Sequence, residues 1–417
     1  MAAPRGQATF ADVFAVAEFR ALFLAQLVSV AGDQLARVAL SILVFERTAS
    51  AGWAAATYAL TFLPDLLGGP LLSGLADRFP RRRVLVCADL ARVVLVGAMA
   101  VPGMSLPLVA ALLVCVQMLN SPWGAARAAL LPQVLAGERF VVGTAVFSMV
   151  TQTAQVLGFA LGGLIVAWLG PGGALAVDAA TFAVSAVVVR FGVRSRPVPG
   201  CAESSGSPKK PGWARELRAG TALVVCDREL RALVALACVS GFYIAGEAVA
   251  APYAAAIGGG AASVGLLFAS YAVGNVTGMA LLARVPHAQR TQLLRPLAVL
   301  ACAPLMGCAL NPGLGVTLAL WFCSGAAGAY NLTASTLFVQ AVPDARRGQA
   351  FGLAVTALRV AQGTGVVLAG ITAEHLPPHQ VVAIAGALGV LAAIGAGLSW
   401  NKANSASRGL ARASDMI

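Results

Sequence analysis

Long apolar runs, separated by short polar segments, recur along the whole chain of 417 residues. Each run has close to 20 residues, and an α-helix of that length crosses roughly 30 Å of hydrocarbon. The pattern predicts an all-α membrane protein with twelve transmembrane helices. We expect these helices at residues 22–45, 51–76, 84–104, 106–128, 140–168, 173–190, 230–256, 262–283, 293–310, 313–338, 349–373 and 380–400.

Composition supports this interpretation. Charged residues make up 11% of the chain, whereas soluble proteins carry about 25%, and the mean hydropathy is +0.82. The 45 glycines suit helices that pack closely in lipid. The cysteines lie mostly in apolar runs without paired spacing, so we expect no metal site and no disulfide framework.

A polar segment at 191–229, rich in Pro, Ser, Lys and Arg, divides the apolar runs into two sets of six. We therefore expect a six-helix bundle at 1–190, a cytoplasmic linker at 191–229, a second bundle at 230–400 and a cytoplasmic tail at 401–417. The halves also repeat weakly, because the stretch from Gln133 aligns with the stretch from Gln340 at seven of 31 positions. Such six-plus-six duplication is typical of transporters, which bind substrate between the halves.

The distribution of Lys and Arg predicts the orientation. Of the 29, 25 fall in segments on one side of the predicted membrane, three lie within spans (Arg37, Arg92 and Arg359), and Arg47 falls on the other side. Positive residues favour the cytoplasmic side, so both termini are expected there, with the protein in the plasma membrane. The net charge of +12 then reflects topology and implies the lipid bilayer as partner, with no nucleic acid. The N-terminus lacks the pattern of a signal peptide.

The stretch "SGLADRFPRRRVL", Ser73 to Leu85, places four arginines and one aspartate between two apolar runs. It resembles the signature loop G-x-L-x-D-R-x-G-R-R of the major facilitator superfamily, with Ser73 and Pro80 in place of the two glycines. The resemblance extends to the drug:proton antiporters that include macrolide and siderophore exporters. It is carried by four further stretches: "AQLVSVAGDQLARVAL", "VLVCADLARVV", "SPWGAARAALLPQVL" and "GGALAVDAATFAVSA". The resemblance implies a fold of two pseudo-symmetric six-helix bundles.

The charges of this loop suggest a conformational switch. A carboxylate at the membrane edge can pair with guanidinium groups and with a helix N-terminus in one state and release them in another. The set of switch residues is Asp77, Arg78, Arg81, Arg82, Asp89, Arg92 and Arg127. Alternatively, these arginines serve only to anchor the topology.

Ionisable residues inside predicted spans are functional candidates, because charge is costly in lipid. Asp33 lies about 16 Å deep in the first span, and Glu247 lies in the seventh, so both are candidates for proton coupling or for static polar contacts. Asp65 and Arg359 have equal predicted depths, near 15 Å. The family resemblance places their helices face to face, so we expect an ion pair; binding of an anionic substrate by Arg359 is the alternative. Asp178 is expected near the outer end of its span, in a headgroup-level or structural role.

The segment "GFALGG" resembles an antiporter signature, with Phe159 in place of Pro. Its glycines, Gly158, Gly162 and Gly163, are expected to act in helix packing or as a hinge. Polar and aromatic residues of other spans are candidates for lining a substrate cavity: Gln34, Asn120, Trp123, Gln155, Tyr271, Asn275, Asn331 and Gln362.

These features favour a secondary active exporter that exchanges hydrophobic or amphipathic small molecules for protons, as in multidrug and antibiotic resistance. Alternatives are an importer or symporter of a small metabolite, and a transporter-like sensor without flux. No phosphate-binding P-loop and no catalytic set occur in the sequence, so an enzyme, a cofactor and a metal are not expected. We expect a monomer.

Overall fold

The structure is a computed structural model that describes residues 9–62, 78–196, 225–342 and 347–414. Within these ranges every regular element is helical, which confirms the all-α class predicted from the apolar runs. Eight helical segments in the described part are long and apolar enough to cross a membrane. The chain divides into two compact units, Met1–Leu43 with Pro64–Pro208, and Val44–Leu63 with Lys209–Ile417.

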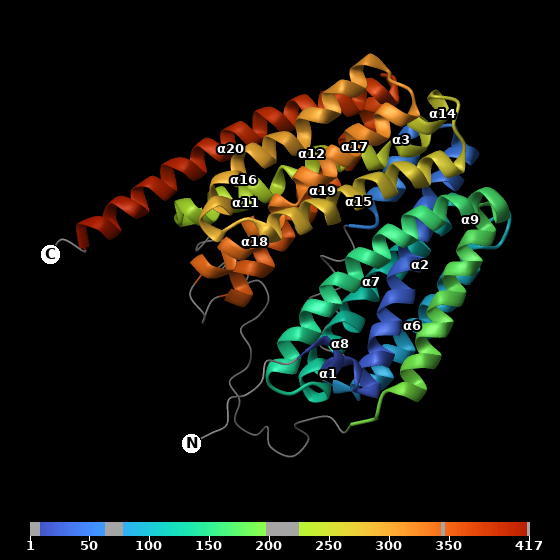
Figure 1. Ribbon diagram of the computed structural model, residues 1–417. Coiled ribbons are helices and arrows are strands. Elements are labelled where there is room, and N and C mark those ends of the chain that lie inside the picture. The colour runs from blue at the N-terminus through green and yellow to red at the C-terminus, as the bar shows by residue number, and fades with distance from the viewer. Residues whose placement is uncertain (1–8, 63–77, 197–224, 343–346, 415–417) are drawn as a thin grey trace, which may run out of the picture. The chain divides into compact units, whose positions relative to one another are not determined.

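The first unit contains the N-terminal helices. Its elements are α1 (Phe10–Phe14), most of α2 (Ala17–Thr48), α6 (Arg81–Met99), α7 (Leu106–Met118), α8 (Asn120–Val134) and α9 (Glu138–Gly192). Figure 1 shows α9 doubling back on itself. The reversal lies at Gly170, whose φ of 70° suits glycine, and Pro171 follows. The two legs of α9 correspond to the predicted spans 140–168 and 173–190.

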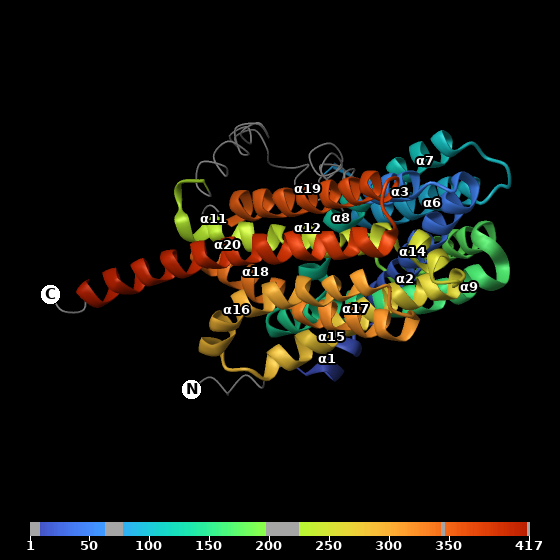
Figure 2. The ribbon, with the colours of Figure 1, turned by 90° about the horizontal axis from the view of Figure 1, so that it is seen from above.

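The second unit contains the C-terminal helices together with α3 (Ala51–Ala59), which packs against α19. Figure 2 gives a second view of these helices. Their bounds are α11 (Arg228–Cys238), α12 (Ser240–Tyr243), α13 (Ala245–Ala248), α14 (Ala250–Ala256), α15 (Ala261–Arg284), α16 (His287–Cys302), the 3₁₀ helix η1 (Ala303–Leu310), α17 (Leu314–Gly328), α18 (Tyr330–Ala341), α19 (Arg347–Ala373) and α20 (Pro378–Ser414).

Two departures from the expected spans are informative. The predicted seventh span comprises α11 to α14. Val239 and Ile244, which join the first three, keep right-handed helical backbone angles, and the helix bends at Val249, whose φ is −106° and ψ is 15°. The last helix continues to Ser414, well past the expected end at residue 400. Most of the predicted second span lies outside the described residues.

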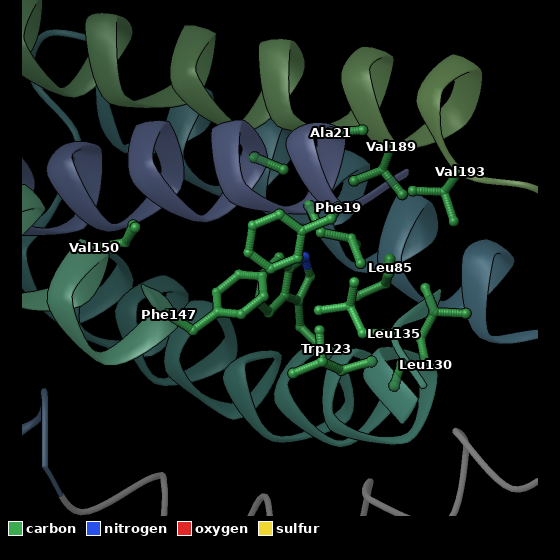
Figure 3. Packing of buried hydrophobic residues seen from close by; sticks show 14 of the residues in the cluster. Phe19, Ala21, Leu85, Trp123, Leu130, Leu135, Phe147, Val150, Val189 and Val193 are labelled. Carbon is green, nitrogen blue, oxygen red and sulfur yellow. The ribbon is translucent and has the colours of Figure 1, made fainter. Parts of the chain in front are cut away.

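A hydrophobic cluster fixes one end of the first unit (Figure 3). Phe19 of α2 meets Phe147 of α9 edge to face, with ring centroids 5.4 Å apart, and Trp123 of α8 packs in the same cluster. Edge-to-face pairs add about 0.5–1.5 kcal/mol beyond the burial of their area. The cluster therefore holds α2, α6, α8 and α9 in register beside the polar residues described next.

Candidate functional site

A buried acidic cluster lies in the first unit and consists of Asp33, Asp89, Asp178 and Arg92. Asp89 and Arg92 are one turn apart on α6, and both side chains are almost fully buried. Arg92 Nη1 lies 3.5 Å from Asp89 Oδ1, and Ser185 Oγ donates a hydrogen bond of 2.7 Å to Asp89 Oδ2. A charge in such surroundings is tolerated only with a counter-charge and hydrogen bonds.

Arg92 connects this pair to a neighbouring helix. Its Nη2 donates to Asn120 Oδ1 at 2.7 Å, and Asn120 Nδ2 donates to Gln117 Oε1 at 3.1 Å. The guanidinium also lies over the ring of Phe182, 5.2 Å from the centroid. Asn120, expected to line a substrate cavity, is therefore engaged in orienting Arg92.

The remaining two carboxylates come from different helices. Asp33 is half-buried at the middle of α2, and it interacts electrostatically with both Asp89 and Asp178. Asp178 is 1% exposed on the second leg of α9, where Thr181 Oγ1 donates to the Asp178 carbonyl oxygen at 2.7 Å and also lies 3.2 Å from its Oδ1. A Cβ added at Gly32 would collide with Asp178 Oδ1, so the carboxylate lies directly against the α2 backbone beside Asp33.

This burial favours the structural role expected for Asp178 over the headgroup-level one. Asp178 follows the bend at Gly170 by eight residues, which is about 12 Å of helix. The second leg therefore carries it to the level of Asp33, into the interior of the unit.

Two of the loop arginines donate hydrogen bonds to backbone carbonyls of neighbouring segments. Arg81 Nη1 donates to the carbonyl of Ala129 at 2.7 Å, and Arg82 Nη1 donates to that of Val193 at 3.1 Å. Val193 is the C-cap of α9, so Arg82 opposes the negative end of that helix dipole, whereas Ala129 lies within α8. Arg78 is exposed, and Asp77, the expected switch carboxylate, lies outside the described residues.

Arg127, another expected switch partner, lies over the rings of Phe147 and Trp123, at 4.8 and 5.8 Å from their centroids. Trp123 itself is 6% exposed within the hydrophobic cluster. This placement differs from the cavity role suggested by the sequence, because the indole packs the core.

The expected packing glycines are buried, and two of them lie where α9 crosses α2. A Cβ at Gly158 would collide with the carbonyl oxygen of Ala31, and one at Gly162 would approach Leu35 Cα at 3.2 Å. Small residues thus allow the close approach that packing in lipid favours. Gln34 is buried at this crossing, and Gln155 is half-buried one turn before Gly158.

A second polar site, the tyrosine cluster, lies in the second unit and consists of Glu247, Tyr58, Tyr243 and Tyr271. Glu247 is 4% exposed on α13, two residues before the bend at Val249. Tyr58 of α3 donates a short hydrogen bond to Glu247 Oε2, and its ring stacks on Phe268 at 6.0 Å.

The other cavity candidates of this unit gather near the same tyrosines. Asn331 Nδ2 donates to the Tyr243 hydroxyl at 2.5 Å, and the rings of Tyr243 and Tyr271 lie 6.1 Å apart. A Cβ at Gly328 would lie 3.3 Å from the Tyr271 hydroxyl and 3.5 Å from Asn275 Nδ2. Gln362 Nε2 donates to Ser240 Oγ at 3.4 Å. The structure therefore brings Tyr271, Asn275 and Asn331 together.

Arg359 is half-buried on α19, and its guanidinium lies 5.7 Å from the centroid of the Phe62 ring. Its expected partner Asp65 lies outside the described residues, so the pair stays a prediction.

One further contact joins α3 to the end of α19. Glu374 Oε1 accepts hydrogen bonds from Ser50 Oγ at 2.5 Å and from the Gly52 N–H at 2.6 Å, at the N-terminus of α3. These two hydrogen bonds, chiefly, hold the pKa of Glu374 below its usual value, and nearby His375 adds to the effect. We call this contact the Glu374 cap.

Two of these site residues were missed by the sequence analysis. Tyr58 is 189 residues from Glu247 and lies in an apolar run, where a tyrosine is unremarkable by itself. Ser185, which donates a hydrogen bond to Asp89, likewise has nothing in its local sequence that marks it as a site residue. Among the described residues, no group of three or more His, Cys, Asp or Glu side chains is placed to hold a metal ion.

Comparison with known proteins agrees with this architecture. The family model described as Major Facilitator Superfamily matches residues 22–310. Among solved structures, the nucleoside transporter NupG aligns with a TM-score of 0.72 at 12% identity, covering 92% of this chain and all of its own.

A POT family transporter in complex with a thioalcohol-conjugated peptide aligns with a TM-score of 0.73 at 9% identity, covering 92% of this chain and 96% of its own. A bacterial homologue of the iron transporter ferroportin, in an inward-facing state, aligns at 0.65 and 13% identity, covering 95% of this chain and all of its own. At such identities the likeness shows the fold alone. A search of curated protein sequences finds no match.

Proposed function

The chain belongs to the major facilitator superfamily as a membrane transporter, and from that premise we propose that it exports hydrophobic or amphipathic small molecules in exchange for protons. The single observation that carries this proposal is the buried acidic cluster. Three carboxylates around one buried guanidinium form an arrangement whose charge is costly in the membrane and is relieved by binding a proton.

In this proposal, Asp33 is the principal proton-coupling residue. A proton entering from outside reduces the negative charge of the cluster, and its release restores that charge, which favours a cationic or amphipathic substrate. Binding of proton and substrate to different conformations then drives alternating access, because each ligand shifts the population toward the state it prefers. Glu247 is the second candidate for this role.

The loop residues are proposed to act in the conformational change. Asp77 would pair with arginines at the cytoplasmic edge in one state and release them in the other. Arg81 and Arg82 would hold the loop in place through the carbonyls of Ala129 and Val193. The orientation with both termini in the cytoplasm, the plasma membrane location and the monomeric state belong to the same proposal.

One observation favours a second candidate, a symporter or importer of a small anionic metabolite. Arg359 places a half-buried cation on α19, beside the ring of Phe62, and a guanidinium recognises carboxylates and phosphates well. In that case Arg359→Gln would abolish substrate binding, whereas Asp33→Asn would be tolerated.

The test uses the full-length protein in liposomes that contain a trapped pH dye. A panel of amphipathic drugs is added under an imposed proton gradient, and wild type is compared with Asp33→Asn. The matched control is Glu46→Gln, which neutralises an exposed glutamate near the end of α2. We expect drug-triggered proton movement in wild type and in the control, and its loss in Asp33→Asn.

Drug flux without proton movement in wild type would remove the antiport proposal. Coupled movement in which drug and proton enter together would favour the symporter. Absence of flux with drugs, nucleosides and peptides alike would favour a sensor.

A further inference from the structure

The segment at residues 44–63 packs with a different half of the chain from the one that its place in the sequence suggests. It lies between the main part of α2 and α6, which both belong to the first unit, yet it groups with the second unit. Its helix α3 packs against α19. The halves of such transporters move against each other during alternating access, so the contacts of α3 are the ones to examine for a role in that movement.

Two carboxylates of the second unit hold α3, one near each end of the helix. At the start, Glu374 accepts hydrogen bonds from Ser50 Oγ at 2.5 Å and from the Gly52 N–H at 2.6 Å, which form the Glu374 cap. Further along α3, Tyr58 donates to Glu247 Oε2. Glu374 is exposed, whereas Tyr58 and Glu247 are 3% and 4% exposed. Water can replace the hydrogen bonds at the exposed end, so the Glu374 cap is the contact that opens first.

Small residues form the contact between α3 and α19 next to this cap. A Cβ added at Gly370 of α19 would collide with Ala55 Cβ and would lie 3.3 Å from Gly52 Cα. The two backbones therefore approach closely, as small residues allow. A glycine and an alanine present no long side chain to interlock the helices, so these surfaces can part and meet again.

The chain has a joint immediately before α3. Ala49 lies between the end of α2 at Thr48 and the start of α3 at Ala51, and its φ is 52°. Residues other than glycine adopt this left-handed conformation at a cost, and such strained positions often occur where a chain switches between states. A single residue of this kind gives α3 a point at which to turn relative to α2.

We propose that the Glu374 cap is a latch: it holds α3 on α19 in this structure and opens when the transporter changes state. Opening uncovers the face of α3 between Gly52 and Tyr58, and so leads toward Glu247. The inference rests on the proposed function, because α3 needs to leave α19 only in a protein that alternates between states. It assigns a conformational role to Glu374 and makes the second proton-coupling candidate accessible only while the latch is open.

The experiment measures how fast a cysteine between the two ends of α3 is labelled. Ala55→Cys places a thiol at a position that is 0% exposed and lies against Gly370. The full-length variant in lipid nanodiscs is treated with a water-soluble maleimide at neutral pH. Mass spectrometry of the peptide that carries residue 55 separates its labelling from that of the native cysteines. Rates are compared with and without Glu374→Gln, which keeps the shape of the side chain and removes its charge.

We expect Glu374→Gln to raise the labelling rate at residue 55 about two- to fivefold, the range that an exposed charged contact supports. A neutral amide accepts weaker hydrogen bonds than a carboxylate, so the cap is open for a larger fraction of the time. The matched control is Glu46→Gln, which neutralises an exposed glutamate near the end of α2 and should leave the labelling rate unchanged.

A second cysteine separates opening of the latch from unfolding. Ala298 is 0% exposed on α16 of the same unit, so Ala298→Cys is labelled when that unit unfolds. An equal rise at residues 55 and 298 would show that Glu374→Gln only destabilises the protein, and an unchanged rate at residue 55 would show that the cap does not open. Either result would overturn the proposal. If Ala55→Cys does not fold, Ala51→Cys, at a buried position of the same helix, takes its place.

This outcome is separate from that of the proposed function, because the labelling requires no substrate. A latch that opens without drug-driven proton movement would contradict antiport and leave the latch in place. Antiport with an unchanged labelling rate in Glu374→Gln would do the reverse.

Discussion

The two polar sites differ in how they hold a negative charge. In the acidic cluster, Asp89 relies on a full counter-charge from Arg92, and two further carboxylates stand beside the pair. In the tyrosine cluster, the single carboxylate of Glu247 accepts a hydrogen bond from the hydroxyl of Tyr58. The Tyr58 hydroxyl stabilises the carboxylate through this hydrogen bond and carries no net charge itself.

This contrast separates two kinds of behaviour. A group with more acids than bases gains stability by binding a proton, so its protonation is open to control by a gradient. The Glu247 carboxylate accepts a hydrogen bond from the Tyr58 hydroxyl and is the single carboxylate of its cluster, so it lacks the surplus of neighbouring acids that the acidic cluster has. We therefore assign proton coupling first to the acidic cluster and expect a smaller contribution from Glu247.

The largest expected effect comes from removing the guanidinium of the acidic cluster. Arg92→Met leaves Asp89 buried without its counter-ion, and loss of one partner of a buried pair costs about 3–5 kcal/mol. Thermal unfolding in detergent should show a markedly lower midpoint. The exposed Arg83 on the same helix offers the control Arg83→Met, which should change little.

The double variant Asp89→Asn with Arg92→Met should recover much of this loss, because neither charge remains buried alone. An equal loss of stability in the single and double variants would show that Arg92 acts through its contacts with Phe182 and Asn120 rather than through its charge.

The corresponding change in the tyrosine cluster should cost less. Tyr58→Phe removes one hydroxyl that donates to Glu247, and hydrogen bonds to charged groups contribute about 1.5–3 kcal/mol. The control is Tyr253→Phe, which removes a buried contact to the neutral Thr317 hydroxyl, where about 0.5–1.5 kcal/mol is expected.

A double-mutant cycle with Glu247→Gln isolates the interaction between Tyr58 and Glu247. A coupling energy near zero would contradict the assignment of Tyr58 as the donor that stabilises this carboxylate.

The glycine crossing beside the acidic cluster gives a third test. Gly158→Ala places a methyl group against the carbonyl oxygen of Ala31, and overpacking of this kind costs about 1–3 kcal/mol. Gly97→Ala on α6 is the matched control, because a Cβ there meets nothing within 4 Å. Equal unfolding midpoints for the two variants would show that α2 and α9 can separate at little cost.

The smallest effect is expected at the Glu374 cap. The folded pKa of Glu374 is lowered by its hydrogen bonds, so the cap stabilises the protein above the usual carboxyl pKa. This contribution is lost as the pH falls through the lowered value. Glu374→Gln should therefore differ from wild type at neutral pH and match it in acid. A difference that persists in acid would assign the effect to the side chain's shape.

Local spacing explains which features were predictable from the sequence. The apolar runs predicted the helices, and the three-residue interval between Asp89 and Arg92 placed both on one face of α6, where they pair. The packing of Asp178 against α2 was not predictable, because it depends on the bend at Gly170, which carries the second leg back beside α2. Partners such as Tyr58 come from distant segments whose packing no local pattern encodes, and Trp123 was assigned to a cavity because burial in a core and in a pocket look alike in sequence.

The most direct test of the central claim is the number of protons moved per substrate in liposomes, compared between Asp33→Asn and Glu247→Gln. We expect Asp33→Asn to abolish proton movement, while Glu247→Gln slows transport and keeps the ratio of protons to substrate. Loss of coupling in Glu247→Gln with normal coupling in Asp33→Asn would contradict it and assign the proton to the tyrosine cluster.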